Sequence, residues 1–305
     1  GAAMAVSSVS VVTNSLRLRK KSIGNVILSE SGDELLNEVK NLNTSVEETS
    51  QALSTTHYKP WITIRDVSSE GRSHRVFGHK SQRTHHLLSD LELSAFLLLE
   101  WHSSTIDIRE QYPLDLEHTL EIAESIRIPH PKLGKHHQIM TSDFLVDTNN
   151  SKSPKFAVQV KYSNALNDPR TIEKIEIERQ YWKKQNVPFY IFTEHQVPLI
   201  VSQNIQWLYS SLSTLELNGQ DTLHKLNFYS DIFKNNKSKK INELARFIDQ
   251  KYQFEMGRSL REIRDLLAQR YFIFDLNISF KDLKTDHIQL GQINLWNEVL
   301  RAENQ

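Results

Sequence analysis

The chain has 305 residues, of which 37 are Lys or Arg and 37 are Asp or Glu, so its formal charge at pH 7 is zero before the 13 histidines are counted. It has no cysteine, which excludes a disulfide-stapled fold, a thiolate zinc site, an iron–sulfur cluster and a cysteine nucleophile. Zero net charge argues against a protein that coats nucleic acid by bulk electrostatics, although it does not exclude local basic patches. The apolar runs are too short to span a bilayer, and we expect no signal peptide. We therefore expect a soluble, intracellular protein.

The N-terminal part of the chain differs in texture from the rest. Residues 5–56 are rich in Ser, Thr, Asn and Val and carry a short basic cluster at 17–21. Apolar periodicity is weak there, except at 33–42, where the pattern is that of a helix. We assign residues 1–56 to an arm or loosely packed extension.

The next part of the chain has the pattern of an α/β domain. Ser89 and Glu92 have the spacing of a helix-starting capping box, and Asp168-Pro169 is a cap followed by a first-turn proline. The predicted elements are a helix at 89–101, strands at 141–147 and 156–161 joined by a polar loop, a helix at 168–185 and a strand at 189–192. This order predicts a sheet with helical cover, in a domain that we place at 57–194.

The last third of the chain is predicted to be mainly helical. Its expected elements are helices at 201–212, 241–252 and 259–269 and short strands at 271–276 and 286–292. Ser259 and Glu262 have the spacing of a second capping box. Two helices and a two-stranded ribbon are typical of a winged-helix module, although many small α+β domains share this order. We therefore predict a winged-helix-like domain at 195–305. Its lysine cluster at 234–240 suits either DNA or an acidic partner surface, and the sequence does not separate the two.

Four residues carry a pattern with chemical meaning: Glu92, Asp143, Gln159 and Lys161. Side chains alternate along a strand, so Gln159 and Lys161 share one face. If the two strands pair as a hairpin, Asp143 lies across from them, and the preceding helix can bring Glu92 to the same edge. Carboxylates hold Mg²⁺, the ion polarises a phosphate and activates water, and the lysine stabilises charge on phosphorus. The pattern therefore suits metal-dependent phosphodiester hydrolysis.

Each of these residues also has a purely structural interpretation. Glu92 can cap its own helix, and Asp143 can form a turn at a strand end. Gln159 and Lys161 can lie on the solvated face of an edge strand. The spacing of Asp143, Gln159 and Lys161 is a weak pattern by itself, and the glutamine weakens it further.

A basic run precedes the first predicted helix. Residues 71–89 contain no acidic side chain, and such a run can contact phosphates beside a nuclease site. The alternative is a solvated loop. The candidate DNA-binding residues are Arg72, His74, Arg75, Lys80, Arg83, His85 and His86. The histidine pairs do not have metalloprotease spacing, so zinc is not expected. No phosphate-binding glycine loop is present, so ATP hydrolysis is not expected.

A set of short motifs occurs in a fixed order along the chain. They are Pro60-Trp61, 71–75, 83–92, 107–114, 142–147, Gln159-Val160-Lys161, 173–179 and 204–209. Together they resemble the TnsA endonucleases, which are the endonuclease subunits of heteromeric cut-and-paste transposases of the Tn-seven class. The resemblance is strong over residues 58–210 and looser beyond them.

The resemblance implies a restriction-endonuclease-like domain, a winged-helix-like domain, and cleavage at the 5′ ends of a transposon with Mg²⁺, for which Mn²⁺ can substitute. It implies action in the bacterial cytoplasm, at the nucleoid, with two partners: a TnsB-type transposase that cuts the 3′ ends and a TnsC-type ATPase that binds the C-terminal region. The implied catalytic residues are Glu92, Asp143, Gln159 and Lys161. The metal ligands would be Glu92, Asp143 and the main-chain carbonyl of Gln159. Glu178 is a further candidate, with a surface ion pair to Lys174 as the alternative.

Two other classes of function stay open at this point. One is a non-catalytic DNA-binding adaptor within a transposition complex. The other is a stand-alone restriction or junction-resolving nuclease, which would cleave DNA without partners.

Overall fold

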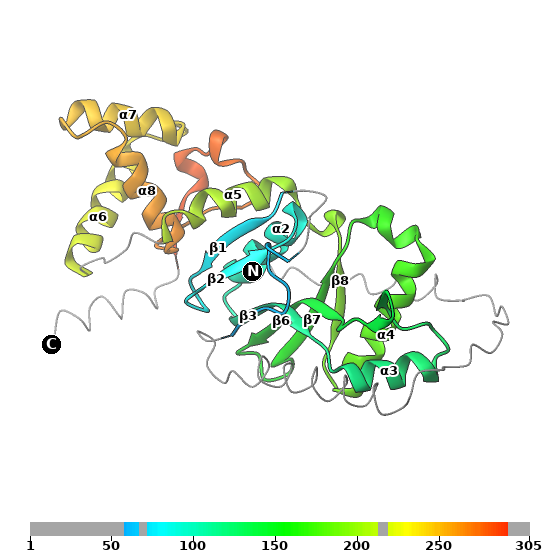
Figure 1. The fold of residues 1–305 in the computed structure, drawn as a ribbon. Helices are drawn as coiled ribbons and strands as arrows, with labels where there is room; N and C mark the ends of the chain where they lie inside the picture. The colour runs from blue at the N-terminus through cyan, green and yellow to red at the C-terminus, as the bar shows by residue number, and fades with distance from the viewer. Residues whose placement is uncertain (1–57, 67–71, 213–218, 292–305) are drawn as a thin grey trace. The chain divides into compact units, whose positions relative to one another are not determined.

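The computed structural model describes residues 58–66, 72–212 and 219–291, so the arm predicted at 1–56 lies outside the described residues. The helices and strands are β1 His74–Gly78, β2 Arg83–Leu87, α2 Asp90–Trp101, β3 Thr105–Pro113, α3 Leu116–Ser125, β4 Lys132–Leu133, β5 His136–His137, β6 Thr141–Thr148, β7 Lys155–Val160, α4 Pro169–Lys184, β8 Phe189–Phe192, α5 Leu199–Tyr209, α6 Gly219–Asn235, α7 Ile241–Lys251, α8 Arg258–Ala268, β9 Phe272–Ile273 and β10 Gln289–Leu290 (Figure 1). Within these described ranges, no helix is both long enough and apolar enough to cross a membrane.

A four-stranded sheet with the order β3-β6-β7-β8 forms the centre of the α/β part of the chain. β3, β6 and β7 are antiparallel, and β8 runs parallel to β7. The pairs Phe144↔Val158 and Asp147↔Lys155 confirm the hairpin expected from the sequence. Asp143 and Gln159 therefore lie at the end of this hairpin that is remote from its loop.

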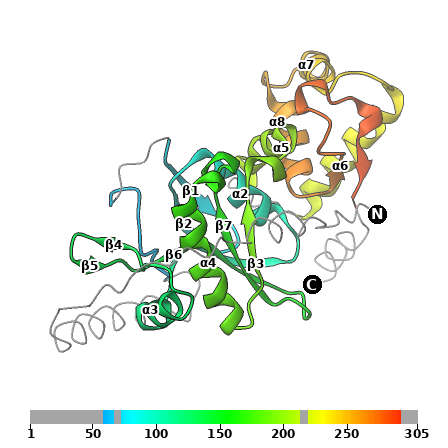
Figure 2. The same ribbon diagram turned by 90° about the vertical axis from the view of Figure 1, so that its right-hand side faces the viewer.

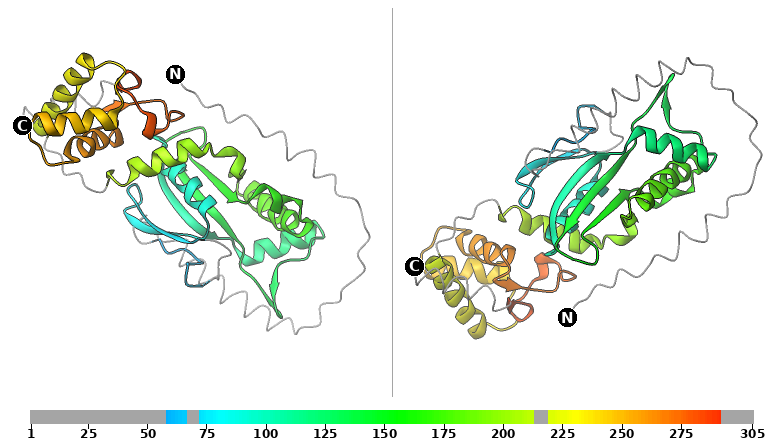
Figure 3. Two further views of the ribbon diagram at one scale, coloured as in Figure 1. Left: turned by 90° about the horizontal axis from the view of Figure 1, so that it is seen from above. Right: turned by 90° about the horizontal axis from the view of Figure 1, so that it is seen from below.

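Both faces of the sheet are covered. Phe144 and Val158 pack with α2 and α5 in one buried cluster, whereas Leu145 and Ala157 pack with side chains of α3 and α4 in another. Figures 1 and 2 show α3 and α4 together on one side of the sheet, and Figure 3 shows α5 running beside α2. Burial on both faces explains why β6 carries a continuous apolar run, Phe144-Leu145-Val146, rather than apolar residues at alternate positions only.

The basic run at 71–89 is folded rather than a solvated loop, because it contains the antiparallel hairpin β1–β2. The inner face of the hairpin carries Val76 and Leu87, which pack against the α2 side of the core. Gly78 is required here, because a Cβ atom at this position would lie 2.5 Å from Nε2 of His85. The two strands of the hairpin and its turn are therefore tightly packed around the His85 ring.

α5 contributes to two cores. Its Val201 and Ile205 pack with α2 and the sheet, while Leu208 packs with α6, α7 and α8. The Asn204 side chain, which is fully buried, donates to the carbonyls of Leu276 and Ile278 at 2.8 and 2.7 Å. This helix therefore connects the sheet-containing part to the helical part.

The capping box predicted at Ser259 is wrong. α8 begins at Arg258, with Gly257 as its N-cap in a left-handed conformation. The two carboxylate oxygens of Asp249, from α7, accept hydrogen bonds from the main-chain N–H groups of Gly257 and Ser259 at 2.8 and 3.0 Å. Glu262 instead accepts from the Tyr229 hydroxyl at 2.6 Å. A carboxylate from a neighbouring helix thus caps α8, and a local sequence pattern cannot reveal that.

Candidate active site

The residues predicted on β6 and β7 come together at the end of their hairpin. One carboxylate oxygen of Asp143, Oδ2, accepts from the main-chain N–H of Val160 at 2.7 Å and lies 3.4 Å from Nζ of Lys161. The main-chain N–H of Asp143 donates to Oε1 of Gln159 at 3.2 Å. Asp143 and Gln159 are buried, and Lys161 is partly exposed. The site therefore opens to solvent on the side of its lysine.

Glu92 caps its own helix, which is the structural interpretation that the sequence allowed. Its Oε2 accepts from the main-chain N–H of Leu88 at 2.8 Å, and its own N–H donates to Oγ of Ser89 at 3.1 Å. Burial, followed by the negative charge of Asp143, raises the pKa of Glu92 to about 7. Because a carboxylate has about four lone-pair positions, capping does not prevent Glu92 from binding a cation as well.

Glu178 does not form the surface ion pair with Lys174 that the sequence allowed. It is buried on α4, where it accepts from Oγ of Ser142 at 2.5 Å. The indole N–H of Trp182 donates to the same hydroxyl at 2.7 Å. Burial raises the pKa of Glu178 to about 8, with a further contribution from Asp143. Glu178 therefore lies directly behind the strand that carries Asp143.

Gln111 of β3 is a site residue that sequence reasoning missed. Its side-chain Nε2 donates to Oδ1 of Asp143 at 3.2 Å, and its Oε1 accepts from Oγ1 of Thr141 at 3.1 Å. Its backbone is left-handed, with φ of 47°. The motif at 107–114 contained this residue, but no periodicity indicated that its side chain reaches Asp143, which is 32 positions away.

The donor set has a definite chemical character. Within the described part of the chain, no group of three or more His, Cys, Asp or Glu side chains is arranged to hold a metal ion. Glu92 and Asp143 provide two carboxylates, and the effect of Asp143 on the Glu92 pKa shows that they repel each other. Two buried carboxylates of this kind fit a divalent cation with few protein ligands, which is the usual situation for Mg²⁺.

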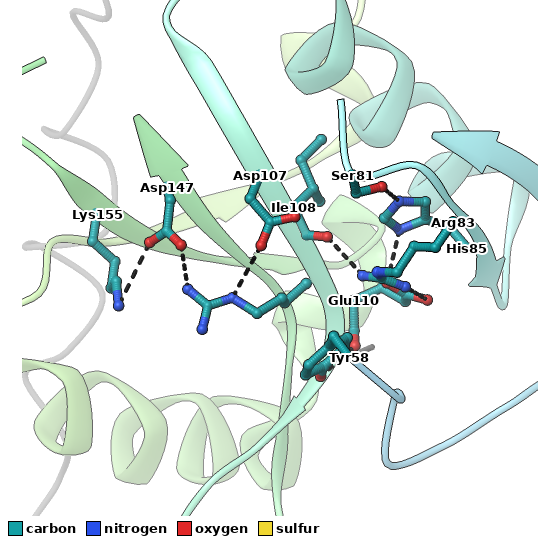
Figure 4. Close-up of polar contacts among 10 residues, drawn as sticks. Tyr58, Ser81, Arg83, His85, Asp107, Ile108, Glu110, Asp147 and Lys155 are labelled. Atoms are coloured by element: carbon teal, nitrogen blue, oxygen red, sulfur yellow. Dashed lines mark hydrogen bonds and ion pairs between the residues drawn. The ribbon is translucent and has the colours of Figure 1, made fainter. Parts of the chain in front are cut away.

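Arg83 and His85 do not face solvent, so the structure does not support their predicted contact with DNA. The Arg83 guanidinium donates to both oxygens of Glu110 at 2.9 and 2.6 Å, and Nδ1 of His85 lies 2.7 Å from the same carboxylate (Figure 4). All three side chains are buried. Despite that burial, the hydrogen bonds and positive charge of His85 and Arg83 lower the pKa of Glu110 to about 2. These two side chains therefore stabilise the fold.

The other predicted DNA-binding residues divide into two groups. Arg72 and His74 pair with Asp90 at the start of α2, and Nζ of Lys80 donates to two carbonyls beyond the end of that helix. In contrast, Arg75 and His86 are paired positions on the outer face of β1–β2. Arg75 is exposed, and His86 is partly exposed. Of the seven predicted residues, these two and the highly exposed Arg72 are the ones placed to meet a ligand.

The fold and the site together define an α/β protein with a helical C-terminal region and a carboxylate–lysine cluster at the end of its sheet. Family models agree with this class: "TnsA-like endonuclease N terminal" matches residues 102–194, and "TnsA endonuclease C terminal" matches residues 196–276. The first match includes Asp143, Gln159, Lys161 and Glu178, whereas Glu92 precedes it.

A curated relative gives the same result. The "Transposon Tn7 transposition protein TnsA" of Escherichia coli is 42% identical over 247 residues, which cover 81% of this chain and 90% of the relative. The chain therefore belongs to the TnsA endonuclease family, and it is a DNA endonuclease.

Proposed function

We propose that the chain is the Mg²⁺-dependent endonuclease that cuts the 5′ ends of a transposon during cut-and-paste transposition. The observation that carries this proposal is the position of Asp143, whose carboxylate is held by Val160 and lies beside Lys161. The transposition role is supported by similarity to the relative named above. This arrangement favours catalysis over an adaptor role, because an adaptor has no need of buried carboxylates beside a lysine.

The proposed metal ligands are the Glu92 and Asp143 carboxylates and the main-chain carbonyl of Gln159. Bound there, Mg²⁺ or Mn²⁺ would polarise the scissile phosphate and neutralise charge on the leaving oxygen. Lys161 acts separately, because its ammonium orients the attacking water or stabilises the negative charge that builds on phosphorus. Buried Glu178, linked through Ser142 to the Asp143 strand, steadies the site from behind.

A carboxylate-to-amide substitution tests this proposal. We expect Asp143→Asn to abolish nicking at the 5′ ends, because it removes the charge that holds the cation. Asp147→Asn is a matched control on the same strand, since Asp147 pairs with Arg109 and Lys155 near the opposite end of the hairpin. Strand-specific nicking of transposon-end DNA, with and without the partner proteins, is the measurement. Undiminished nicking by Asp143→Asn would refute the proposal, and full cleavage without partners would indicate a stand-alone nuclease.

The outer face of β1–β2 is the proposed DNA contact within this domain. Arg75 lies opposite His86, and exposed Phe77 lies opposite Thr84. Cationic and aromatic side chains on one ribbon face suit the phosphates and sugars of DNA. Arg72, which is 82% exposed despite its ion pair with Asp90, extends this surface.

The proposed domain arrangement is a restriction-endonuclease-like domain at 57–194 and a winged-helix-like domain at 195–305. The order α6, α7, α8, β9, β10 supports the second part, and so does an antiparallel bridge between Lys240 and Lys284 at the start of α7. We further propose a TnsB-type transposase and a TnsC-type ATPase as partners, the latter through the C-terminal domain, in the bacterial cytoplasm at the nucleoid.

A further inference from the structure

We propose that Gln111 is a positioning residue, which fixes the orientation of the Asp143 carboxylate and thereby sets the affinity of the site for its divalent cation. The inference rests on the proposed function, because it takes Asp143 as a metal ligand. Gln111 itself is not placed to bind the cation or the DNA in this scheme, since it acts through Asp143.

The hydrogen bonds of Asp143 leave its carboxylate little freedom. Oδ1 accepts from Nε2 of Gln111, while Oδ2 accepts from the main-chain N–H of Val160 and from Lys161. An ionised carboxylate only accepts hydrogen bonds, so the nitrogen of the Gln111 amide must be the atom that faces it. The two oxygens are therefore held from two different sides, by β3 and by the end of β7, and rotation of the carboxylate would break bonds on both sides.

The Gln111 backbone indicates that this position is specified. A left-handed φ at a non-glycine residue is a strained conformation, and it persists where the surroundings enforce it. The β3–β6 pairing continues on both sides of Gln111, through Glu110↔Phe144 and Tyr112↔Ser142. Trp61 N–H donates to the Gln111 carbonyl at 3.2 Å. The strained residue is thus fixed from its main chain, and its side chain is directed at Asp143.

The neutral amide is chemically suited to this role. A cationic side chain in its place would compete with the metal ion for Asp143, and a second carboxylate would repel Asp143. The amide donates one hydrogen bond and leaves the negative charge of Asp143 available. Its other end is held by the Thr141 hydroxyl, so the donor cannot turn away without losing a second bond. Side chains that orient a metal ligand in this way are typically worth about 10- to 100-fold in metal affinity or activity.

The test compares variants of the full-length protein. Gln111→Met keeps the length and flexibility of the side chain but removes its donor, and Thr141→Val removes only the hydroxyl that steadies the amide. Tyr58→Phe is the structural control, because it removes a hydrogen bond to the neighbouring residue of the same strand and makes no contact with Asp143. Mn²⁺ binding is measured by calorimetry without DNA, together with thermal unfolding and the Mg²⁺ dependence of nicking.

We expect Gln111→Met to weaken Mn²⁺ binding about 10- to 100-fold and to raise the Mg²⁺ concentration needed for half-maximal nicking. Thr141→Val should shift both in the same direction by less, and Tyr58→Phe should lower thermal stability without changing Mn²⁺ affinity. Wild-type Mn²⁺ affinity in both Gln111→Met and Thr141→Val would overturn the inference, as would an equal loss in Tyr58→Phe. If Asp143→Asn binds Mn²⁺ like the wild type, the proposed function fails and this inference fails with it. If Asp143→Asn loses Mn²⁺ binding while Gln111→Met and Thr141→Val keep wild-type affinity, only the inference about Gln111 is overturned.

Discussion

At the scale of single residues, the balance of charge around Lys161 is the central feature of the site. Burial by itself would lower the pKa of Lys161, but the carboxyl groups of Asp143, Glu178 and Glu92 together raise it. The ammonium is therefore held in its charged form among three acidic groups. This is the state needed to stabilise negative charge on a phosphate, whereas a neutral amine would serve only as a base.

Replacement of this cation should separate catalysis from metal binding. We expect Lys161→Ala to slow nicking by about 10²- to 10³-fold, the usual cost of removing one group that stabilises transition-state charge. Mn²⁺ binding should persist, because the carboxylates are unchanged and one competing cation has been removed. Single-turnover nicking at saturating metal and calorimetry with Mn²⁺ measure the two effects. Loss of Mn²⁺ binding in this variant would contradict the assigned role.

The buried carboxyl of Glu178 predicts an unusual pH dependence of stability. With its pKa raised to about 8, this group keeps its proton in the folded protein where the unfolded chain has lost it. Its contribution is therefore fully present below the unfolded pKa of about 4.5 and declines as pH rises to about 8, by up to about 1.4 kcal/mol per pH unit. Glu178→Gln has no such proton to lose. The melting temperature of Glu178→Gln minus that of metal-free wild type should therefore increase from pH 5 to pH 8. A difference that stays constant over this range would show that Glu178 is ionised in the folded protein.

At the scale of secondary-structure elements, the β1–β2 hairpin shows how alternation assigns residues of one type to different roles. Arg83 and His85 lie on its inner face with Glu110, while Arg75 and His86 lie on the outer face. The sequence presents all four as one basic run. The inner pair differs from the outer pair because it has a buried acidic partner, Glu110 of β3, which is 25 to 27 positions away in the sequence.

The outer face of this hairpin can be tested through salt dependence. We expect Arg75→Ala to weaken binding to DNA of any sequence and to reduce the slope of log affinity against log salt by about 1, as expected for one lost phosphate contact. Lys152→Ala is the control, because Lys152 is an exposed lysine in the loop between β6 and β7 and is not part of the β1–β2 surface. Fluorescence anisotropy at several salt concentrations measures the slopes. Equal slopes for wild type and Arg75→Ala would exclude this surface.

Much of the local structure could be predicted from the sequence, because it depends on neighbours along the chain. The strands predicted at 141–147 and 156–161 occur at 141–148 and 155–160, and the Ser89 cap of α2 and the Asp168-Pro169 start of α4 also agree with prediction. The strand at 189–192 was also predicted, and its parallel pairing with β7 follows from the intervening helix.

The remaining elements depend on contacts between distant residues. β1, β2 and β3 were missed because their inward-facing positions include charged side chains that are buried only with partners. α6 was missed because its sequence is polar overall, although Leu226, Tyr229 and Phe233 recur at helical spacing and are buried. The predicted C-terminal strands are much shorter than expected, with two residues each.

The candidate site follows the same rule. Alternation and hairpin pairing placed Asp143 beside Gln159 and Lys161, since both depend on period two. The sequence does not decide the role of Glu178, because an exposed ion pair with Lys174 fits helical spacing equally well. Gln111 could not be predicted, because a left-handed residue inside a strand breaks the alternation on which strand-face assignments depend.

At the scale of the whole molecule, the position of α5 in both cores governs stability. The helix lies in the C-terminal family match, yet Ile205 is buried against α2 and the sheet of the other part. We expect Ile205→Ala to lower the free energy of unfolding by about 2–5 kcal/mol, as for other buried large-to-small substitutions. Ile200→Ala is a matched control on the same helix, because Ile200 is 42% exposed, and it should change stability by less than about 0.5 kcal/mol. Denaturant unfolding measures both, and similar values would contradict the packing role of α5.

The double burial of α5 also has a consequence for how these proteins can diverge. A hybrid of two relatives joined at the border between the two family matches would combine α5 of one parent with α2 and the sheet of the other. Substitutions at positions such as Val201 and Ile205 are then constrained by residues on the far side of that border. A crossover after α5, between residues 212 and 219, would keep this packing within one parent. That later crossover would instead separate Leu208 of α5 from its contacts with α6, α7 and α8. Exchange of C-terminal regions is therefore expected to need matched residues around α5 wherever the two parents are joined.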